Sequence, residues 1–216
     1  MRLYHAQLVG DNCLPDHFRM LVSGPTGSGK TKFVENLIHS KRIRKKFSRI
    51  YYAFPDHFVE NPVNWDQWPD YIVTFLPFLP DVEFIQNMEP DSLLVLDDNF
   101  PDAIKSPAIS QAMRIHSRRK FSVILISQMF YEAGPYSRTI RNQLNAIVLF
   151  RNFCDCSINR RIATQLGVKD QFLQAEKVTQ KSKYNPIVIL SGEIVTTHEM
   201  RVQTDYLSTA YSLCYK

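Results

Sequence analysis

Eight consecutive residues near one end of the chain form its clearest chemical pattern. Residues 24–31 match GxxxxGK[ST]; they follow an apolar run typical of a strand and precede an amphipathic segment typical of a helix. Glycines let backbone N–H groups turn toward a bound phosphate, and the positive end of the following helix faces the same anion. We predict a phosphate-binding loop formed by Gly24, Pro25, Thr26, Gly27, Ser28, Gly29, Lys30 and Thr31.

Two side chains of this loop have separate predicted roles. The Lys30 ammonium reaches the β- and γ-phosphates of a nucleotide, and the Thr31 hydroxyl coordinates Mg²⁺. An incidental glycine-rich turn is the alternative, which the strand-loop-helix setting disfavours. The chain has only 7 glycines, and three of them fall within these eight residues. That concentration fits a place where phosphate approaches the backbone.

Two carboxylates end the apolar run at residues 93–96. Asp97 and Asp98 stand where this predicted strand leaves the sheet. In P-loop enzymes one acid on the strand beside the loop serves the Mg²⁺ shell, and hydrolysis needs a second group that orients and deprotonates the attacking water. We predict Asp97 for the metal and Asp98 for catalysis. An aspartate pair that only caps the following turn is the alternative, and the phosphate loop argues against it.

A further polar residue, Gln128, follows the predicted strand at residues 122–127. A polar side chain at this strand end can contact both the attacking water and the γ-phosphate. Alone, Ser-Gln after a strand is a turn signal; the order of loop, acidic strand and polar strand makes Gln128 a predicted catalytic sensor.

Short apolar runs that alternate with helical segments must position these residues. The predicted strands are 18–23, 49–54, 71–75, 93–96, 122–127 and 146–150, and the predicted helices are 31–40, 155–166 and 169–177. Continuous apolar runs imply strands covered on both faces, which is typical of a mainly parallel α/β sheet. Residues 186–190 and 193–197 predict a hairpin at an antiparallel edge.

Charge and composition narrow the class of protein. The chain has a net charge of +5, and its charges are segregated along the sequence. Residues 1–49 and 105–161 each hold 10 basic side chains, whereas residues 50–104 hold 11 acidic and no basic ones. Such segregation favours a polyanionic partner. The apolar runs are far below the roughly 20 residues of a bilayer span, and no secretory signal is evident. We therefore expect an intracellular protein without membrane insertion. The four cysteines show no metal-ligand spacing, so we expect neither disulfides nor structural zinc.

The order GPTGSGKT, LLVLDD and SRRKFSVILISQMFYEAGPYSRTIRNQLNAIVLFRN resembles the FtsK–HerA superfamily of DNA-pumping ATPases. Within it, the resemblance is closest to the genome-packaging ATPases of double-stranded DNA viruses, the poxvirus-like and polinton- or adintovirus-like group. It covers residues 18–166, and residues 128–150 are its most specific part. One departure concerns Asp98, because cellular members usually have glutamate there.

The resemblance implies a RecA-like domain that binds ATP and Mg²⁺ and assembles into a homo-oligomeric ring, a pentamer or hexamer. Such a ring would push viral double-stranded DNA into a preformed capsid, with a capsid vertex protein as a further partner. We expect a single ATPase domain, with an N-terminal arm at residues 1–17, a core at 18–166 and a C-terminal helix and hairpin at 167–216. The expected location is the host cytoplasm or nucleus at virus assembly sites, or the virion.

A ring motor usually completes its site with an arginine from the neighbouring subunit, because guanidinium stabilises charge on the γ-phosphoryl group. Arg118, Arg119, Arg138 and Arg141 are the candidates. Arg138 lies in the SRTI match and Arg119 in a basic turn before the sensor strand, so these two are the predicted catalytic arginines. A structural or DNA-facing role is the alternative for each.

Two further segments have predicted contacts. Six positive charges within residues 41–49 could follow the DNA backbone by sequence-independent phosphate contacts, or form a solvated helix end. Residues 51–78 contain nine aromatic residues, Trp65 and Trp68 among them, and no Lys or Arg. Stacking platforms for single strands normally carry basic neighbours, so we interpret this segment as core and a subunit or capsid contact surface.

Other function classes remain as alternatives. A nucleoside or nucleotide kinase shares the length and the loop, although the sensor-strand order argues against it. A GTPase switch is disfavoured because this chain contains no NKxD motif for recognising guanine. An ATP-dependent virion assembly protein that does not translocate DNA is opposed only by the basic segments.

Overall fold

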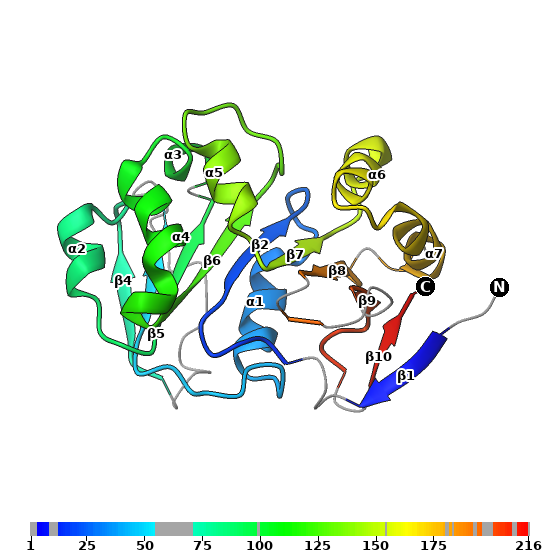
Figure 1. Cartoon of the computed structure of the whole chain (residues 1–216), viewed down its shortest axis with the longest axis horizontal. Coiled ribbons are helices and arrows are strands. Elements are labelled where there is room, and N and C mark those ends of the chain that lie inside the picture. Colours follow the sequence, from blue (N-terminus) through cyan, green and yellow to red (C-terminus); the bar gives the residue numbers. More distant parts are fainter. Residues whose placement is uncertain are drawn as a thin grey trace. The chain divides into compact units, whose positions relative to one another are not determined.

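Figure 1 shows the computed structural model of the chain, which describes residues 4–8, 13–54, 71–98, 100–153, 155–179, 182, 184–191, 194–195, 201–208 and 211–215. The chain divides into two compact units. The first comprises Met1–Pro15, Val22–Arg44 and Asn145–Lys216, and the second comprises Asp16–Leu21 and Lys45–Leu144. Strand β2 (Arg19–Ser23) crosses the division between Leu21 and Val22, so it contributes residues to both units.

The second unit is built on a parallel sheet. Its strand order is β6-β5-β3-β4, with β6 at Phe121–Ser127, β5 at Ser92–Asp97, β3 at Ile50–Ala53 and β4 at Val73–Leu76. All three strand pairs are parallel. Every residue of β3, β5 and β6 is buried, as expected for strands covered on both faces. The start of β2 joins this unit, where the Phe18 carbonyl accepts a 2.8 Å hydrogen bond from Val123 N–H.

Helices α2 (Val82–Asn87), α3 (Phe100–Ala103), α4 (Pro107–Arg119) and α5 (Ser137–Asn142) belong to the same unit. Helix α4 contacts β6, α2 and α5. It begins where the Ser106 hydroxyl accepts a hydrogen bond from Ile109 N–H at 3.3 Å, with Pro107 in its first turn. It ends at Lys120, whose φ of 56° stops the helix and turns the chain into β6.

The first unit carries an antiparallel sheet. Its strand order is β1-β10-β9-β8-β7, with β1 at Tyr4–Leu8, β10 at Tyr211–Cys214, β9 at Val202–Thr204, β8 at Ile187–Leu190 and β7 at Ala146–Leu149. All four pairings are antiparallel. The end of β2 joins it, because the Ser23 carbonyl accepts a 2.8 Å hydrogen bond from Phe150 N–H. Residues 4–8, predicted as part of an arm, thus form a sheet strand.

Three helices complete the first unit: α1 (Lys30–Ile38), α6 (Cys156–Gln165) and α7 (Lys169–Thr179). Helix α7, drawn in ochre in Figure 1, contacts α6, β8 and β9. The buried face of α1 contains Phe33, Val34, Leu37 and Ile38, which is the predicted apolar face. Among the described residues, no helix is long and apolar enough to cross a membrane.

The hairpin predicted around Ser191 differs from the structure. β8 pairs with β7 and with β9, which begins only at Val202. Ile194 lies in a turn instead of a strand, and its N–H donates to the Ser191 carbonyl at 3.1 Å. Residues 193, 196 and 197 of the predicted second strand lie outside the described residues. The prediction erred because Val202–Thr204 is too short a run to stand out as a strand.

Candidate functional site

The phosphate loop connects β2 to α1 in the first unit, as predicted. Gly27 and Gly29 have φ values of +73° and +95°, a region that side chains other than glycine rarely adopt. Gly29 caps α1 directly, and no acidic residue lies in the first turn of the helix. The first N–H groups of α1 therefore face no competing carboxylate on that turn, which suits an anion.

The polar side chains of the loop turn back over it. Lys30 is buried, and its Nζ donates to the Pro25 carbonyl at 3.1 Å, so the ammonium crosses the loop. Ser28 N–H donates to the same carbonyl at 3.2 Å. Ser28 Oγ is buried and finds no hydrogen-bond partner in the described part of the chain. A loop with buried donors of this kind fits a phosphate group.

Gly27 and Gly29 are needed for their positive φ angles, whereas Gly24 is needed because there is no space for a side chain. A Cβ at this position would lie 2.5 Å from the Phe150 Cβ and 3.0 Å from Ser28 Oγ. The 2.8 Å hydrogen bond between Phe150 N–H and the Ser23 carbonyl holds the two backbones together here. The first glycine of the motif therefore permits close strand packing beneath the loop.

We expect Gly24→Ala to lower the free energy of unfolding by about 3 kcal/mol, because the clashing atoms belong to stiff backbone-proximal groups. Gly27→Ala is the matched control. A Cβ at Gly27 would meet no described atom within 4 Å, so only its left-handed φ costs stability, about 1 kcal/mol. Urea unfolding measures both. A Gly24→Ala midpoint equal to that of the native chain would contradict the close approach.

The predicted metal residue Asp97 is the last residue of β5 in the second unit. It is 7% exposed, and one carboxylate oxygen accepts a hydrogen bond from the Tyr52 hydroxyl of β3. Carboxylate and hydroxyl oxygens, such as those of Asp97 and Thr31, are the hard ligands that Mg²⁺ prefers. The Asp97 carboxylate is thus a donor of the type that suits magnesium. The motif did not point to Tyr52, since only the parallel pairing of β3 with β5 brings it beside Asp97.

Asp98 follows Asp97 with a φ of +49° and a half-buried side chain. Aspartate and asparagine tolerate this left-handed conformation better than residues with longer side chains, because their short polar groups can bond locally. This gives a physical reason for aspartate where cellular members of the superfamily usually have glutamate. The turn also redirects the chain sharply at the end of β5.

Gln128 lies at the carboxyl end of β6, and the two aspartates lie at the carboxyl end of the neighbouring parallel strand β5. Asp97 stands opposite Ile126 in the parallel pair of β5 and β6, and Gln128 follows β6 directly. Its side chain is exposed. The Ser127 hydroxyl donates to the Met129 carbonyl at 2.7 Å and accepts from Met129 N–H at 3.1 Å, so the turn that presents Gln128 is fixed locally.

Arg119 does not lie in a turn, contrary to the prediction. It is the exposed last residue of α4, and Lys120 alone makes the connection to β6. β6 has seven residues, about 20 Å of strand. Arg119 therefore lies at the opposite end of β6 from Gln128. Arg138 is exposed in the first turn of α5, which follows Gln128 along the chain.

Arg141 has packing partners within its own unit. Its guanidinium carbon lies 6.0 Å from the ring centre of Phe130 and 5.6 Å from that of Tyr131. This contact anchors the segment after Gln128 to α5. Of the four candidate arginines, Arg141 thus fits the alternative structural role best.

The basic segment at residues 41–49 is not a uniform positive surface. Arg42 is 1% exposed; its Nε donates to the Tyr206 carbonyl at 2.6 Å, and its guanidinium covers the Tyr206 ring. Lys45 pairs with Asp91 at 2.7 Å, and Arg49 pairs with Glu89 at 2.8 Å. Hydrogen bonds from Lys45 and His17 lower the pKa of Asp91. The remaining three cations of the segment are exposed: Lys41, Arg44 and Lys46.

The aromatic, acidic segment is described only in part. Tyr51 and Tyr52 of β3 are core residues, whereas Phe78 is 53% exposed. Residues 55–70, which include Trp65 and Trp68, lie outside the described residues. The predicted contact surface there stays a prediction.

Comparisons with known proteins agree with the motif order. The family model of the poxvirus A32 protein matches residues 6–207. The genome packaging NTPase B204 from Sulfolobus turreted icosahedral virus 2, solved with ATP-gammaS, has a TM-score of 0.57 at 16% identity, covering 84% of this chain and 96% of that chain. The DNA-packaging ATPase B204 from Sulfolobus turreted icosahedral virus has a TM-score of 0.54 at 18% identity, covering 84% and 95%. No curated protein matches.

At these identities the solved structures show the fold alone. They confirm the predicted α/β fold with a mainly parallel sheet and antiparallel C-terminal strands. The family match confirms the resemblance to the poxvirus-like group. The roles of the individual site residues stay predictions.

Proposed function

Because the chain belongs to the poxvirus A32 protein family, we propose that it hydrolyses ATP to move a viral double-stranded DNA genome into a preformed capsid. It is a P-loop ATPase by family, fold and phosphate loop. The observation that carries the proposal is the loop at Gly24–Thr31, whose left-handed glycines and crossing lysine suit a nucleoside triphosphate. The likeness to the B204 proteins supports it, because these are a genome packaging NTPase and a DNA-packaging ATPase.

The proposed chemistry divides among five side chains. Lys30 neutralises charge on the β- and γ-phosphates, and Thr31 and Asp97 hold Mg²⁺. When bound, the ion neutralises charge on the phosphate oxygens. Asp98 orients the attacking water and accepts its proton. Gln128 contacts the same water and the γ-phosphoryl group. Water then attacks the γ-phosphorus, the bond to the β-phosphate oxygen breaks, and ADP and phosphate leave.

The proposed assembly is a homo-oligomeric ring in which an arginine acts on the neighbouring subunit's γ-phosphoryl group. Arg138 and Arg119 are the candidates. The position of Arg119 at the end of α4 supports action on another subunit, because it stands a strand length from Gln128 of its own chain. Double-stranded DNA and a capsid vertex protein are the proposed partners, at virus assembly sites.

The proposal is tested by ATP turnover with and without duplex DNA. We expect DNA to raise the turnover of the assembled protein, because translocation couples the two. Phosphate release at saturating ATP measures it, with single-stranded DNA of equal nucleotide content as control. If DNA does not change the rate of ATP turnover but a nucleoside acceptor is required for it, the protein is a kinase. Turnover that neither DNA nor a nucleoside changes would favour an assembly protein that does not translocate DNA.

The exposed part of the basic segment has its own test. If it contacts DNA, Lys46→Ala should reduce the slope of log binding constant against log salt by roughly 1, since one released counterion is lost. Lys105→Ala is the matched control, because Lys105 is an exposed lysine paired only weakly with Asp102 at 3.7 Å. Fluorescence anisotropy with labelled duplex at four salt concentrations gives the slopes. Equal slopes for both variants and the native chain would place the DNA contact elsewhere.

A further inference from the structure

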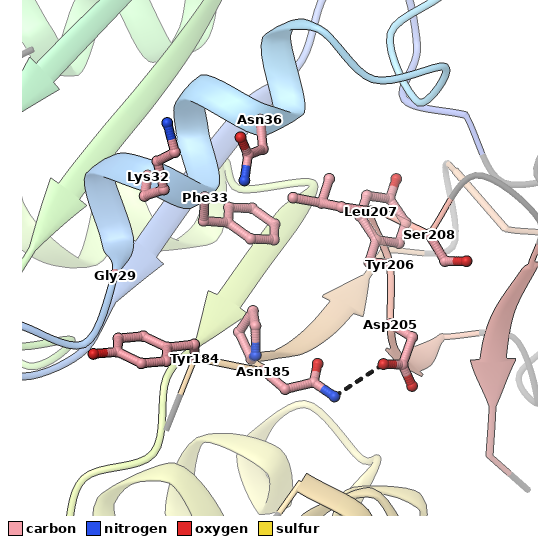
Figure 2. Close-up of a pocket in the computed structure, with 11 residues that line it drawn as sticks. Gly29, Lys32, Phe33, Asn36, Tyr184, Asn185, Asp205, Tyr206, Leu207 and Ser208 are labelled. Carbon is pink, nitrogen blue, oxygen red and sulfur yellow. Dashed lines mark hydrogen bonds between the residues drawn. The ribbon is translucent and has the colours of Figure 1, made fainter. Parts of the chain in front are cut away.

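A pocket of about 430 Å³ opens beside the phosphate loop in the first unit. Figure 2 shows its walls: the start of α1, the segment that leads into β8, and the turn that follows β9. Gly29 belongs both to the phosphate loop and to this pocket. The volume is within the range of small-molecule sites. The pocket is therefore continuous with the place where phosphate would bind.

Tyr184 forms the edge of the pocket nearest the loop. Its ring lies so close to Gly29 that a Cβ there would be 3.2 Å from Tyr184 Cδ1. Tyr184 is nevertheless 62% exposed. In Figure 2 the ring lies beneath the start of α1 and borders the hollow. One face of an aromatic ring is thus presented beside the phosphate loop.

The remaining walls combine apolar and polar groups. Phe33, Pro186 and Leu207 contribute apolar surface, and the buried Phe33 ring is held edge-on by Phe150 at 6.0 Å between ring centres. At the end of the pocket away from Tyr184, Asn185 Nδ2 donates to Asp205 Oδ1 at 3.0 Å (Figure 2). This hydrogen bond uses one N–H donor of the Asn185 amide. The side-chain carbonyl oxygen of Asn185 and the Asp205 carboxylate can only accept hydrogen bonds. The polar end is therefore rich in acceptors.

We propose that this pocket holds the base of ATP, with Tyr184 stacked on the ring and the Asn185–Asp205 pair accepting hydrogen bonds from the 6-amino group. The inference rests on the proposed function, because it extends the nucleotide outward from the phosphate loop. A pocket with apolar walls and an aromatic ring at its edge suits a purine, since base stacking on aromatic rings does not require a particular edge. The acceptor-rich end then favours an amino group over the keto oxygen of inosine.

The first test separates the base from the phosphates. Tyr184→Ala is expected to weaken ATP binding about tenfold, the usual cost of losing one stacking ring, and to leave the binding of inorganic triphosphate unchanged. Tyr184→Phe should restore ATP binding to within about twofold, because stacking needs the ring and not the hydroxyl. Phe78→Ala is the matched control, as Phe78 is 53% exposed in the second unit. Isothermal titration calorimetry measures each dissociation constant.

The second test addresses the amino group. Asp205→Asn retains a residue type that tolerates the observed φ of 53°, but it adds donors at the polar end. The ratio of ATP to inosine triphosphate affinity should fall about tenfold, because an amide can donate to the keto oxygen. Melting temperatures within a few degrees of the native chain would show that both variants fold.

Three results with the variants would overturn the inference: equal loss of ATP and triphosphate binding in Tyr184→Ala, unchanged ATP binding in that variant, or an unchanged affinity ratio in Asp205→Asn. Each of these leaves the proposed function standing if the native chain hydrolyses ATP and Lys30→Ala does not. A native chain that binds inorganic triphosphate and ATP equally well would overturn the base pocket alone. A native chain without any ATP turnover would instead contradict the proposed function.

Discussion

Replacing Lys30 with alanine is expected to lower kcat/KM for ATP hydrolysis by about 10³-fold, the cost of removing one strong electrostatic group from a phosphoryl-transfer site. Lys30 Nζ crosses the loop to the Pro25 carbonyl at 3.1 Å, so the ammonium is already held where phosphate oxygens would lie. The side chain is buried, which excludes water and strengthens its field. Alanine removes the charge and leaves the loop backbone as it is.

Lys105→Ala is the matched control for this variant. Lys105 lies in the second unit, outside the phosphate loop and the pocket beside it, its side chain is 64% exposed, and it pairs with Asp102 at 3.7 Å. Such surface pairs contribute little to stability, so turnover should stay within about twofold of the native chain. Steady-state phosphate release at several ATP concentrations gives kcat/KM for each variant. Comparable losses in the two variants would mean that the Lys30 effect is not specific to the phosphate loop.

Asp98→Asn is expected to lower kcat by about 10³-fold while ATP affinity changes little, because a general base acts in the chemical step. Asparagine keeps the shape of the side chain and tolerates the φ of +49°, so the end of β5 should keep its conformation. Only the ability to accept a proton from water is lost. Single-turnover hydrolysis measures the step, and equilibrium binding of a non-hydrolysable analogue measures affinity.

Two further variants distinguish the proposed roles of the carboxylates. Asp97→Asn should raise the Mg²⁺ concentration needed for half-maximal turnover, whereas Asp98→Asn should leave that concentration unchanged. Asp102→Asn is the matched control, because its side chain is 71% exposed and, among the described residues, forms an ion pair only with Lys105, at 3.7 Å. An Asp98→Asn enzyme with native kcat would move the catalytic base to another residue. A raised Mg²⁺ requirement in both variants would mean that the two carboxylates share the ion.

Most of the parallel sheet could be predicted, because its strands are continuous apolar runs. The runs at residues 93–96 and 122–127 correspond to β5 and β6, and both are fully buried. Long-range antiparallel pairing was harder to predict. β9 has only three residues, and it pairs with β8 although more than ten residues separate the two strands in the sequence. No local sequence pattern encodes such a pairing.

Side-chain partners separated by many residues were also missed. Arg42 appears in a run of basic residues that suggests a DNA surface, yet it packs against Tyr206, 164 residues away. Tyr184 lies in an unremarkable stretch before β8 and comes beside Gly29 only when the first unit folds. Arg119 and Gln128 are close in sequence, but β6 separates them by the length of a strand. Charge and spacing along the sequence cannot tell whether such a side chain is buried against a distant segment or exposed on the surface.

The amino-acid sequence alone determined the phosphate loop, the acidic and polar strand ends and the family, because each depends on residue types at short, fixed spacings. Left-handed φ angles at Gly27 and Gly29 follow from such local requirements. Only the tertiary structure decided why Gly24 is glycine, which cations are exposed, and which ring borders the pocket. Those properties depend on atoms brought together from distant segments, as when Phe150 of one segment lies against the backbone of Gly24.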